Sequence, residues 1–466
     1  MEPFIHLHVH TQYSLLDGQA SIDALINKAY DDGMRAIAVT DHGNMFGIKE
    51  FFNKVNKKNG KVQGTIKDLQ KELKTLGAKE ERTDEENARL AEIPGLLEKA
   101  QGDLFKPIIG CECYCARNHR LQKTEKEDRS GWHLIVLAKN MTGYKNLIKI
   151  VSQSWTDGFY GRPRIDKELL EQHREGLIVC SACLGGEIPQ KIMHGNIHAA
   201  EEAVLWFKQL FGEDYYLELQ RHETHRADAD QTVYKHQVEV NKVLIELAHK
   251  HGVKIIATND VHFVNEEDAD AHDRLICLST GKDLNDPNRM RYTKQEWMKT
   301  TAEMNQIFGD IPDALRNTLE IADKVEFYSI DSGPIMPTFN IPEDFGTEEG
   351  YRQKLTEQDL FDEFTRDENG NVVLSQADAE AKIKKLGGYD KLYRIKLEAD
   401  YLAKLTYEGA KPRYGDPLSD EVKERLNFEL HIMKTMGFPG YFLIVQDFIR
   451  AAREELGVSV GPGRGS

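Results

Sequence analysis

The sequence has few of the features that mark secreted or membrane-spanning proteins. No stretch approaches the roughly 20 consecutive apolar residues that a membrane helix needs. The opening residues 1–4 lack the basic segment and the apolar run of a secretory signal. Cysteine is also scarce, with six residues in a chain of 466, which fits a reducing compartment. These shortages predict a cytoplasmic protein without a membrane partner.

Positive charge is in deficit as well. The formal net charge is -16, which is not typical of a nucleic-acid-binding protein. An acidic average still permits a local basic groove, and it suits a protein that gathers carboxylates around cations. The charge is therefore only a weak argument against DNA as a partner.

Apolar residues are plentiful, at 40% of the chain, and the length suggests two or three domains. Over the first 285 residues, short apolar runs alternate with amphipathic stretches such as Ile22–Asp32 and Tyr234–His251. This alternation is typical of an α/β fold with a parallel sheet or a barrel. The runs that we predict to be strands are Phe4–Val9, Ala36–Thr40, Pro107–Cys113, His133–Ala138, Leu177–Cys180, Tyr216–Leu219 and Lys254–Thr258.

Two breaks in this pattern predict the domain organisation. Residues 54–106 are rich in Lys, Glu, Gln and Leu, which predicts a solvated helical insertion, with a partner-binding arm as the alternative. Residues 1–285 then form the first domain, and residues 286–466 form a second region with helices at Thr301–Phe308 and Pro312–Val325. The chain ends inside a glycine-rich loop, so we expect it to be truncated.

Side chains that bind metals recur at or beside the ends of the predicted strands, where α/β barrels place their active sites. His6, His8 and His10 alternate along the first strand, so their imidazoles share one face. The other residues of this kind are Asp17, Asp41, His42, Glu112, His133, Cys183, Asp260 and His262.

Imidazole, carboxylate and thiolate together suit zinc, manganese or iron better than calcium or magnesium. The set is too large for one ion, so we expect acidic residues to bridge neighbouring ions and to hold a shared hydroxide. A metal cluster of this kind favours hydrolysis of phosphoesters. The alternative is that these side chains bind no metal and only form hydrogen bonds with the polar backbone groups at the strand ends.

The segment His8–Gly18 resembles the first motif of the PHP (polymerase and histidinol phosphatase) superfamily. Four further segments resemble the PHP domain of the C-family of bacterial replicative DNA polymerases, the alpha subunits of DNA polymerase III: Ala38–His42, Asn140–Leu147, Cys183–Glu187 and Ala257–Phe263. Gly437–Val445 and Val460–Ser466 resemble the start of the palm in the same family. The resemblance covers nearly the whole chain, apart from the insertion and parts of residues 365–420.

The resemblance implies an α/β protein with a PHP-type (β/α)7 barrel, followed by a mixed α+β region that begins the polymerase palm. It implies two or three divalent ions, with Asp17, Glu112 and Asp260 as the catalytic residues and 3′–5′ exonuclease proofreading as the activity. The implied metal ligands are His8, His10, Asp17, His42, Glu112, His133, Cys183, Asp260 and His262.

For the palm, the resemblance implies that Gly463, Arg464, Gly465 and Ser466 contact the phosphates of an incoming deoxynucleoside triphosphate. The aspartates that bind the magnesium ions of the polymerase site would lie beyond this loop. The implied partners are primer-template DNA, deoxynucleoside triphosphates, the sliding clamp and other replisome subunits.

Two alternatives to an exonuclease stay open. The PHP domain could be a catalytically silent scaffold that docks a separate proofreading exonuclease, because clustered ligands stabilise folds as well as catalyse. A small-molecule phosphatase is the other alternative, and the second region argues against it.

Four further features lie outside this ligand set. We expect His6 to lie in the core or behind the ligands, and Asp41 to orient its neighbours. His222 and His225 fit a surface loop with a substrate contact. The basic segment Arg289–Lys294 fits either a DNA contact or a solvated loop.

Overall fold

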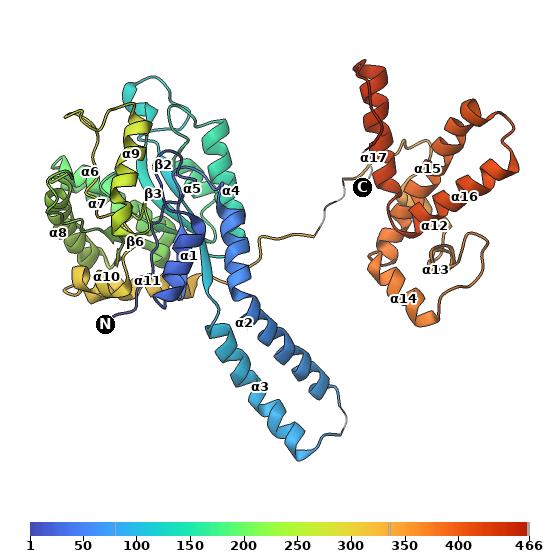
Figure 1. Ribbon diagram of the computed structural model, residues 1–466, viewed down its shortest axis with the longest axis horizontal. Coiled ribbons are helices and arrows are strands. Elements are labelled where there is room, and N and C mark those ends of the chain that lie inside the picture. Colours follow the sequence, from blue (N-terminus) through green and yellow to red (C-terminus); the bar gives the residue numbers. More distant parts are fainter. Residues whose placement is uncertain (80, 334, 336, 464–466) are drawn as a thin grey trace. The chain divides into compact units, whose positions relative to one another are not determined.

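The computed structural model describes residues 1–79, 81–333, 335 and 337–463. The chain divides into two compact units, Met1–Asp331 and Ser332–Ser466. The first unit is a curled sheet surrounded by helices, and the second is a group of helices (Figure 1).

The sheet has the strand order β1-β2-β3-β5-β6-β7, and β4 pairs with β2. Most residues of the sheet are buried, because other parts of the chain cover both faces of the sheet. This explains why its strands are apolar runs in the sequence. The strands are β1 (Ala36–Val39), β2 (Lys106–Cys115), β3 (Trp132–Ala138), β4 (Arg164–Ile165), β5 (Leu177–Cys180), β6 (Tyr215–Leu219) and β7 (Lys254–Ala257).

One strand departs from the parallel arrangement. β3 runs antiparallel to both β2 and β5, whereas the other pairs are parallel. A parallel return needs a crossover, usually a helix, and the connection from β2 to β3 contains only the short 3-10 turn η1 (Lys126–Arg129). The start of β3 therefore lies at the rim where the parallel strands end, and this rim receives His133.

The segment 4–10 closes the barrel without forming the regular strand that we expected. It is buried and lies between β1 and the residues that follow β7. Thr40 N donates to Val9 O at 2.8 Å, and His10 N donates to Val261 O at 2.7 Å. The ladder is interrupted because Val9 N donates to the Thr40 hydroxyl instead of a carbonyl, at 2.8 Å.

Two apolar cores lie on opposite faces of the sheet. The outer core packs the sheet against the surrounding helices, and it includes Cys111, Cys113 and Cys115 as buried apolar groups. The inner core fills the barrel, and Ile135 belongs to it. Glu112 pairs directly with Ile135 across β2 and β3, so strand alternation turns its carboxylate into the barrel.

The surrounding helices of the first unit match the amphipathic stretches of the sequence. They are α1 (Ile22–Asp31), α2 (Ile48–Gly77), α3 (Asp84–Gly102), α4 (Met141–Thr156), α5 (Lys167–Gln172), α6 (Glu187–Met193), α7 (Ile197–Phe211), α8 (Val233–His251), α9 (Ala269–Thr280), α10 (Thr301–Phe308) and α11 (Pro312–Lys324), with the 3-10 turns η2 (Gly212–Asp214) and η3 (Glu266–Asp268).

The first compact unit extends beyond the boundary that we expected near residue 285. Helices α10 and α11 belong to it because their apolar faces complete the barrel's cores. Met304 and Phe308 of α10 join the outer core, whereas Ile321 and Ala322 of α11 join the inner core. Residues 286–331 are therefore structurally part of the barrel unit.

The predicted insertion forms a helical hairpin. Helix α2 continues from the barrel for 30 residues, and α3 returns along it after a short turn. The hairpin extends away from the barrel in Figure 1. Thr83 begins α3 with a capping box, in which its hydroxyl accepts from Glu86 N and its own N–H donates to the Glu86 carboxylate.

Within its described residues, the regular elements of the second unit are helices, joined by loops and with one isolated bridge between Arg366 and Val372. Its small core includes Leu360, Phe364 and Leu392. Residues 457–463, which begin the glycine-rich end, have no regular secondary structure. The helical elements are α12 (Glu348–Lys354), α13 (Glu357–Thr365), α14 (Gln376–Lys385), α15 (Tyr389–Tyr414), α16 (Asp420–Thr435), α17 (Pro439–Arg450) and the π-helical segment η4 (Ala451–Glu455).

Within the described residues, no helix is both long enough and apolar enough to cross a membrane.

Candidate metal centre

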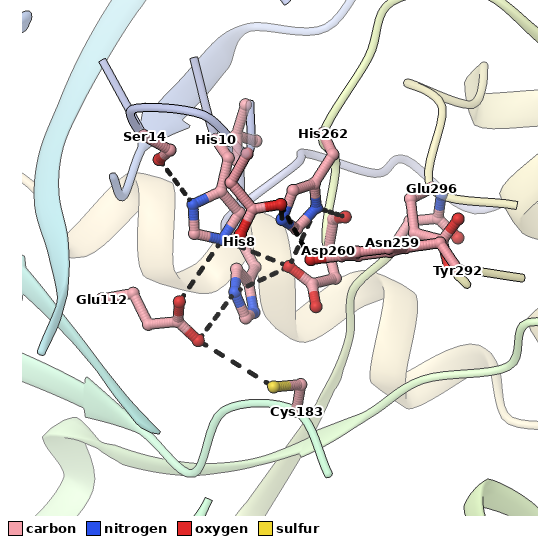
Figure 2. A network of polar contacts seen from close by, with 12 residues as sticks. His8, His10, Ser14, Glu112, Cys183, Asn259, Asp260, His262, Tyr292 and Glu296 are labelled. Carbon is pink, nitrogen blue, oxygen red and sulfur yellow. Dashed lines mark hydrogen bonds and ion pairs between the residues drawn. The ribbon is translucent and has the colours of Figure 1, made fainter. Parts of the chain in front are cut away.

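All nine predicted ligands come together at one rim of the barrel. They arrive from the N-terminal segment, from the residues that follow β1, β5 and β7, from the middle of β2 and from the start of β3. Figure 2 shows the side chains of His8, His10, Glu112, Asp260 and His262 pointing toward one another, with Cys183 beside Glu112.

Glu112 and Asp260 face the two histidines of the first segment. The Nε2 atom of His8 lies 3.0 Å from Asp260 Oδ1 and 3.4 Å from Glu112 Oε1. The Nε2 atom of His10 lies 3.2 Å from Asp260 Oδ1 and 3.5 Å from Glu112 Oε2. The two carboxylates thus share both imidazoles.

Glu112 also faces the ligands on its other side. Its Oε2 atom lies 2.5 Å from His42 Nδ1, and its Oε1 atom lies 2.7 Å from His133 Nδ1. The Cys183 sulfur lies 3.5 Å from His133 Nδ1 and 3.9 Å from Glu112 Oε1. Glu112 is therefore the centre of the cluster.

Asp17 and His262 complete the set at its outer edge. Asp17 Oδ2 lies 3.1 Å from His42 Nε2, and Asp17 Oδ1 lies 3.7 Å from His262 Nε2. His262 Nδ1 is 2.8 Å from the carbonyl oxygen of Asp260, which leaves its Nε2 atom directed at the cluster.

The polar atoms at the centre are buried and close to one another, but within the described residues several of them make no hydrogen bond of acceptable geometry. They include His8 Nε2, His10 Nε2, His262 Nε2, Glu112 Oε2 and Asp260 Oδ1. Two ligands held about 2.1 Å from one ion at a tetrahedral angle are about 3.4 Å apart, which is close to the separations observed here. Buried lone pairs at this spacing fit divalent cations, since unpaired buried polar groups are otherwise costly.

Three overlapping groups of ligand atoms each lie within 4.8 Å of one another. His10 is shared by two of the groups, and Glu112 is also shared by two. The groups are His10 with His42 and His262, His8 with His10 and Glu112, and Glu112 with His133 and Cys183. The shared residues make up to three adjacent ion sites geometrically possible, and the mixed N, O and S donors fit zinc, manganese or iron.

The electrostatics of the cluster favour ionised carboxylates. Burial opposes ionisation of Glu112, but the imidazoles of His133 and His42 outweigh it and hold its pKa well below the ordinary value. Burial likewise opposes ionisation of Asp260, whereas His8 and His262 hold the pKa of Asp260 well below its ordinary value. Glu112 and Asp260 are therefore buried anions, and this charge favours the binding of cations.

Two imidazoles supply that positive charge when no metal ion is present. Burial lowers the pKa of His8, but Asp260 and Glu218 outweigh it and raise this pKa well above 6.5. His42 behaves alike, because Glu112 overcomes the effect of burial on its pKa. His10 differs, since burial and the neighbouring His42 lower its pKa to about 3. Protonated His8 and His42 thus balance the charge of the carboxylates, and a metal ion would have to displace these protons.

Three residues support the ligands; Glu218 and His272 escaped the sequence analysis, and Tyr292 lies in the basic segment Arg289–Lys294 but its contact with Asp17 was not predicted. Glu218 Oε1 lies 2.6 Å from His8 Nδ1 and directs the other ring nitrogen at the cluster. Tyr292 donates its hydroxyl to Asp17 Oδ1 at 2.9 Å. The ring of His272 lies farther back, with Nε2 3.9 Å from Asp17 Oδ1. An acidic residue inside the apolar strand Tyr215–Leu219 was the available signal for Glu218.

Asp41 orients its neighbours, as we predicted. It accepts hydrogen bonds from Thr11 N at 2.7 Å and from the Ser14 hydroxyl at 2.7 Å. The Ser14 oxygen lies 2.9 Å from His10 Nδ1. A chain of polar contacts from Asp41 through Ser14 therefore fixes the orientation of the His10 ring.

Three of the ligand loops contain a non-glycine residue with a positive φ angle, and one of these residues is Leu16, directly before Asp17, with φ 62°. The other two loops follow strands. Asp260 itself has φ 48°, and Ala182, directly before Cys183, has φ 64°. This left-handed conformation is uncommon for such residues and costs conformational energy. Both loops thus turn sharply just after a strand and bring their ligand back over the barrel rim.

A cavity of about 210 Å³ opens beside the cluster. Five of the nine predicted ligands line it: His42, His133, Cys183, Asp260 and His262. Met290, Arg291 and Tyr292 form another part of its wall, which places the basic segment that we singled out next to the ligands. The Nε atom of Arg291 is buried and has no hydrogen-bond partner in the described part of the chain.

Other candidate residues lie elsewhere or outside the description. His6 is buried, and its Nε2 atom contacts Lys299 O at 2.7 Å, so it belongs to the core. His222 is also buried and lines the cavity, which corrects our expectation of a surface position. Gly463 is exposed, whereas Arg464, Gly465 and Ser466 lie outside the described residues.

Two known protein families match parts of the chain. Residues 6–222 match the PHP domain, and residues 400–466 match the bacterial DNA polymerase III alpha NTPase domain.

The curated relatives have one name in common. DNA polymerase III subunit alpha of Borreliella burgdorferi is 38% identical, and the match covers 99% of this chain and 31% of the relative. The corresponding subunits of Treponema pallidum and Thermus aquaticus are each 34% identical over 99% of this chain, with 31% and 34% of their own length covered. The chain thus spans about a third of the length of the curated relatives it matches.

Among solved structures, an amidohydrolase from Chromobacterium violaceum aligns with 57% of this chain and 89% of its own. Its sequence identity is 12% and the TM-score is 0.29, a likeness too slight to argue from. The two family matches and the curated relatives carry the assignment instead. The chain is therefore a homologue of the N-terminal part of the DNA polymerase III alpha subunits, and its residues 6–222 match the PHP domain.

Proposed function

We propose that the cluster at the barrel rim binds two or three divalent metal ions and hydrolyses the 3′-terminal phosphodiester of DNA, as a 3′–5′ exonuclease. The observation that carries this proposal is the sharing of Glu112 and His10 between neighbouring groups of ligand atoms. Shared ligands hold adjacent ions close together, and adjacent ions are suited to phosphoester cleavage. The ions fit as zinc, manganese or iron.

Bound ions would lower the pKa of a water molecule and neutralise charge at phosphorus. The chain's own residues position the reacting groups. Asp17, Glu112 and Asp260 act as catalytic carboxylates, and Tyr292 holds Asp17 at the edge of the cavity. Glu218 and Ser14 hold the rings of His8 and His10, so that their Nε2 atoms stay aimed at the centre.

The cavity beside the cluster is the proposed binding site for the 3′ end of the DNA. Its volume of about 210 Å³ suits a small group such as one terminal nucleotide rather than a duplex end. Arg291 on its wall offers a guanidinium for a phosphate oxygen, and its Nε atom has no partner among the described residues. Met290 and Tyr292 offer apolar surface for a base or sugar.

In the whole protein, we propose DNA-directed DNA polymerisation from deoxynucleoside triphosphates, with magnesium at a separate polymerase site. Gly463, Arg464, Gly465 and Ser466 would then contact nucleotide phosphates. Primer-template DNA, the sliding clamp and other replisome subunits are the proposed partners. The names of the curated relatives support this proposal.

The test compares Asp17→Asn and Asp260→Asn with Asp310→Asn, which removes a carboxylate from a surface ion pair with Arg221. Degradation of a primer with a mismatched 3′ end is measured together with metal content and thermal midpoint. We expect the first two variants to lose nuclease activity while the fold is retained, and the third to keep it.

Two other results would overturn the exonuclease. Loss of thermal stability in the site variants, with no nuclease activity even in the metal-loaded parent, would favour the silent scaffold that docks a separate exonuclease. Release of phosphate from small phosphomonoesters, without cleavage of DNA, would favour a small-molecule phosphatase.

A further inference from the structure

The hairpin of α2 and α3 uses only one side of α2 for its own packing. Leu69 of α2 and Ile93 of α3 are buried between the two helices. The opposite side of α2 faces solvent. Among the described residues 47–120, no large hydrophobic side chain is exposed, and residues 53–104 include no aromatic residue.

The solvent side of α2 carries a row of lysines, which we call the lysine face. The steps between them are four, six, four and three residues, so at 3.6 residues per turn they lie within one half of the helix surface, which also carries the exposed Asp68. All are exposed, and none forms an ion pair with another described residue. The lysine face consists of Lys57, Lys61, Lys67, Lys71 and Lys74.

The charge of this region contrasts with the chain as a whole. Residues 51–67 contain five lysines and no acidic residue, in a protein whose formal net charge is -16. Helix α3 does not neutralise the lysine face. The ion pairs across the hairpin join Arg89 to Glu72 and Lys79 to Glu86, so they use other residues.

The arrangement is unfavourable for an isolated helix. Lys57 and Lys61, and likewise Lys67 and Lys71, are like charges at i and i+4, which destabilise a helix. A merely solvated helix usually alternates charges of opposite sign. With five lysines and a single acidic residue, Asp68, this side of the helix has an excess of positive charge, which favours a partner of the opposite sign.

Two glycines interrupt the same side of the helix. Gly60 and Gly64 lie between the lysines, although glycine destabilises a helix interior. No atom of the described residues lies within 4 Å of where a Cβ would be at either position, so packing within the chain does not require them. The bare backbone permits close approach of an outside partner.

We propose that the lysine face of the α2–α3 hairpin binds the phosphate backbone of double-stranded DNA. Lysines that neutralise phosphates bind nucleic acid without regard to sequence. The row from Lys57 to Lys74 extends about 25 Å along the helix, enough to meet several phosphates. The hairpin is thus a second DNA contact, separate from the metal centre.

Duplex DNA fits this surface better than other partners. Single-strand binding depends on aromatic side chains that stack on bases, and the hairpin has none between residues 53 and 104. A protein partner would need apolar anchors, and the described part of the hairpin exposes no large ones. Phosphates need only the positive charge that is present.

The test measures how binding of a fluorescent 24-base-pair duplex varies with salt concentration, by fluorescence anisotropy of the full chain. Phosphorothioate ends prevent hydrolysis, so the result does not depend on the metal chemistry. The test variant replaces Lys57, Lys61 and Lys71 by Gln. The control replaces the exposed lysines Lys145, Lys149 and Lys242 by Gln, which changes the net charge equally.

We expect the test variant to lose roughly tenfold in affinity at low salt and to lower the slope of log K against log salt by about three. The control should leave the slope nearly unchanged. Gly64→Glu, which adds an acid to the lysine face and removes no lysine, should also weaken binding.

Three outcomes would overturn the proposal. They are an unchanged slope in the test variant, an equal loss in the control, and a loss of affinity for single-stranded DNA with duplex binding intact. Circular dichroism of each variant shows whether the hairpin is folded, and removal of exposed side chains leaves its buried residues in place.

Discussion

Tyr292 donates its hydroxyl hydrogen bond to Asp17 across 275 positions of the sequence, at 2.9 Å. The contact joins the loop after α9 to the loop after the first segment. Asp17 also faces His42 at 3.1 Å, so the tyrosine steadies one of the proposed ligands at the mouth of the cavity.

Replacement of Tyr292 by Phe tests that contact. Removal of the hydroxyl should lower nuclease activity roughly tenfold, because the Asp17 carboxylate would lose the hydrogen bond that orients it. The matched control is Tyr328→Phe, which removes a hydroxyl bonded to Ala138 O, away from the cluster. Steady-state kinetics on a 3′-labelled primer measure both. Equal activity in the two variants would mean that the Tyr292 hydroxyl does not support the site.

Glu218→Gln should weaken metal binding by roughly 10–100-fold, because Glu218 fixes the ring of His8 at 2.6 Å. Competition with a chromophoric chelator measures the affinity. Glu320→Gln serves as the control, since Glu320 is an acidic residue whose partners, Lys254 and Tyr216, lie outside the cluster. If both variants bind metal as the parent does, Glu218 has no part in orienting His8.

The metal-free protein should lose stability as the pH rises above about 6.5. The folded-state pKa values of His8 and His42 are raised, because nearby carboxylates outweigh burial. Their protonation therefore contributes stability that is fully present below about 6.5 and is lost as the pH rises through the folded pKa values. Thermal midpoints across pH 6 to 9 in chelator measure this decline.

The metal-loaded protein should lack that decline, because cations replace the two protons, and metal affinity should strengthen over the same pH range. Identical pH profiles with and without metal would contradict proton competition at His8 and His42.

Cys183→Ser should change which metal is retained. The Cys183 sulfur lies 3.5 Å from His133 Nδ1, and its thiolate is the soft donor of the set. An oxygen in its place favours manganese over zinc, so zinc content should fall by roughly one ion per chain. Cys277→Ser, a buried cysteine outside the cluster, provides the control. Unchanged zinc in the Cys183 variant would exclude the sulfur as a ligand.

The rim itself was predictable because chemistry and periodicity point the same way. His8 and His10 alternate along one segment, and Glu112 alternates with buried cysteines on β2, so each side chain's face follows from its position. The ends of apolar strands then placed Asp260 and His262 at the same rim. Amphipathic spacing also gave the ends of α1, α8, α10 and α11 to within one residue.

Other features depend on contacts distant in sequence and were not predictable. The antiparallel course of β3 follows from a connection that lacks a helix. The inclusion of α10 and α11 in the barrel unit depends on the packing of their apolar faces against the barrel's cores, which lie far away in the sequence. Glu218 was missed because the role of a lone acid in an apolar strand depends on a histidine 210 positions away.

The most direct test of the central claim is elemental analysis of the purified chain alongside degradation of a mismatched primer, for the parent and for Asp260→Asn. We predict two or three zinc, manganese or iron ions in the parent, with nuclease activity that chelator abolishes and added metal restores. The variant should have less metal and no activity. A parent that is fully loaded with metal yet inert toward every 3′ end would contradict the proposed exonuclease.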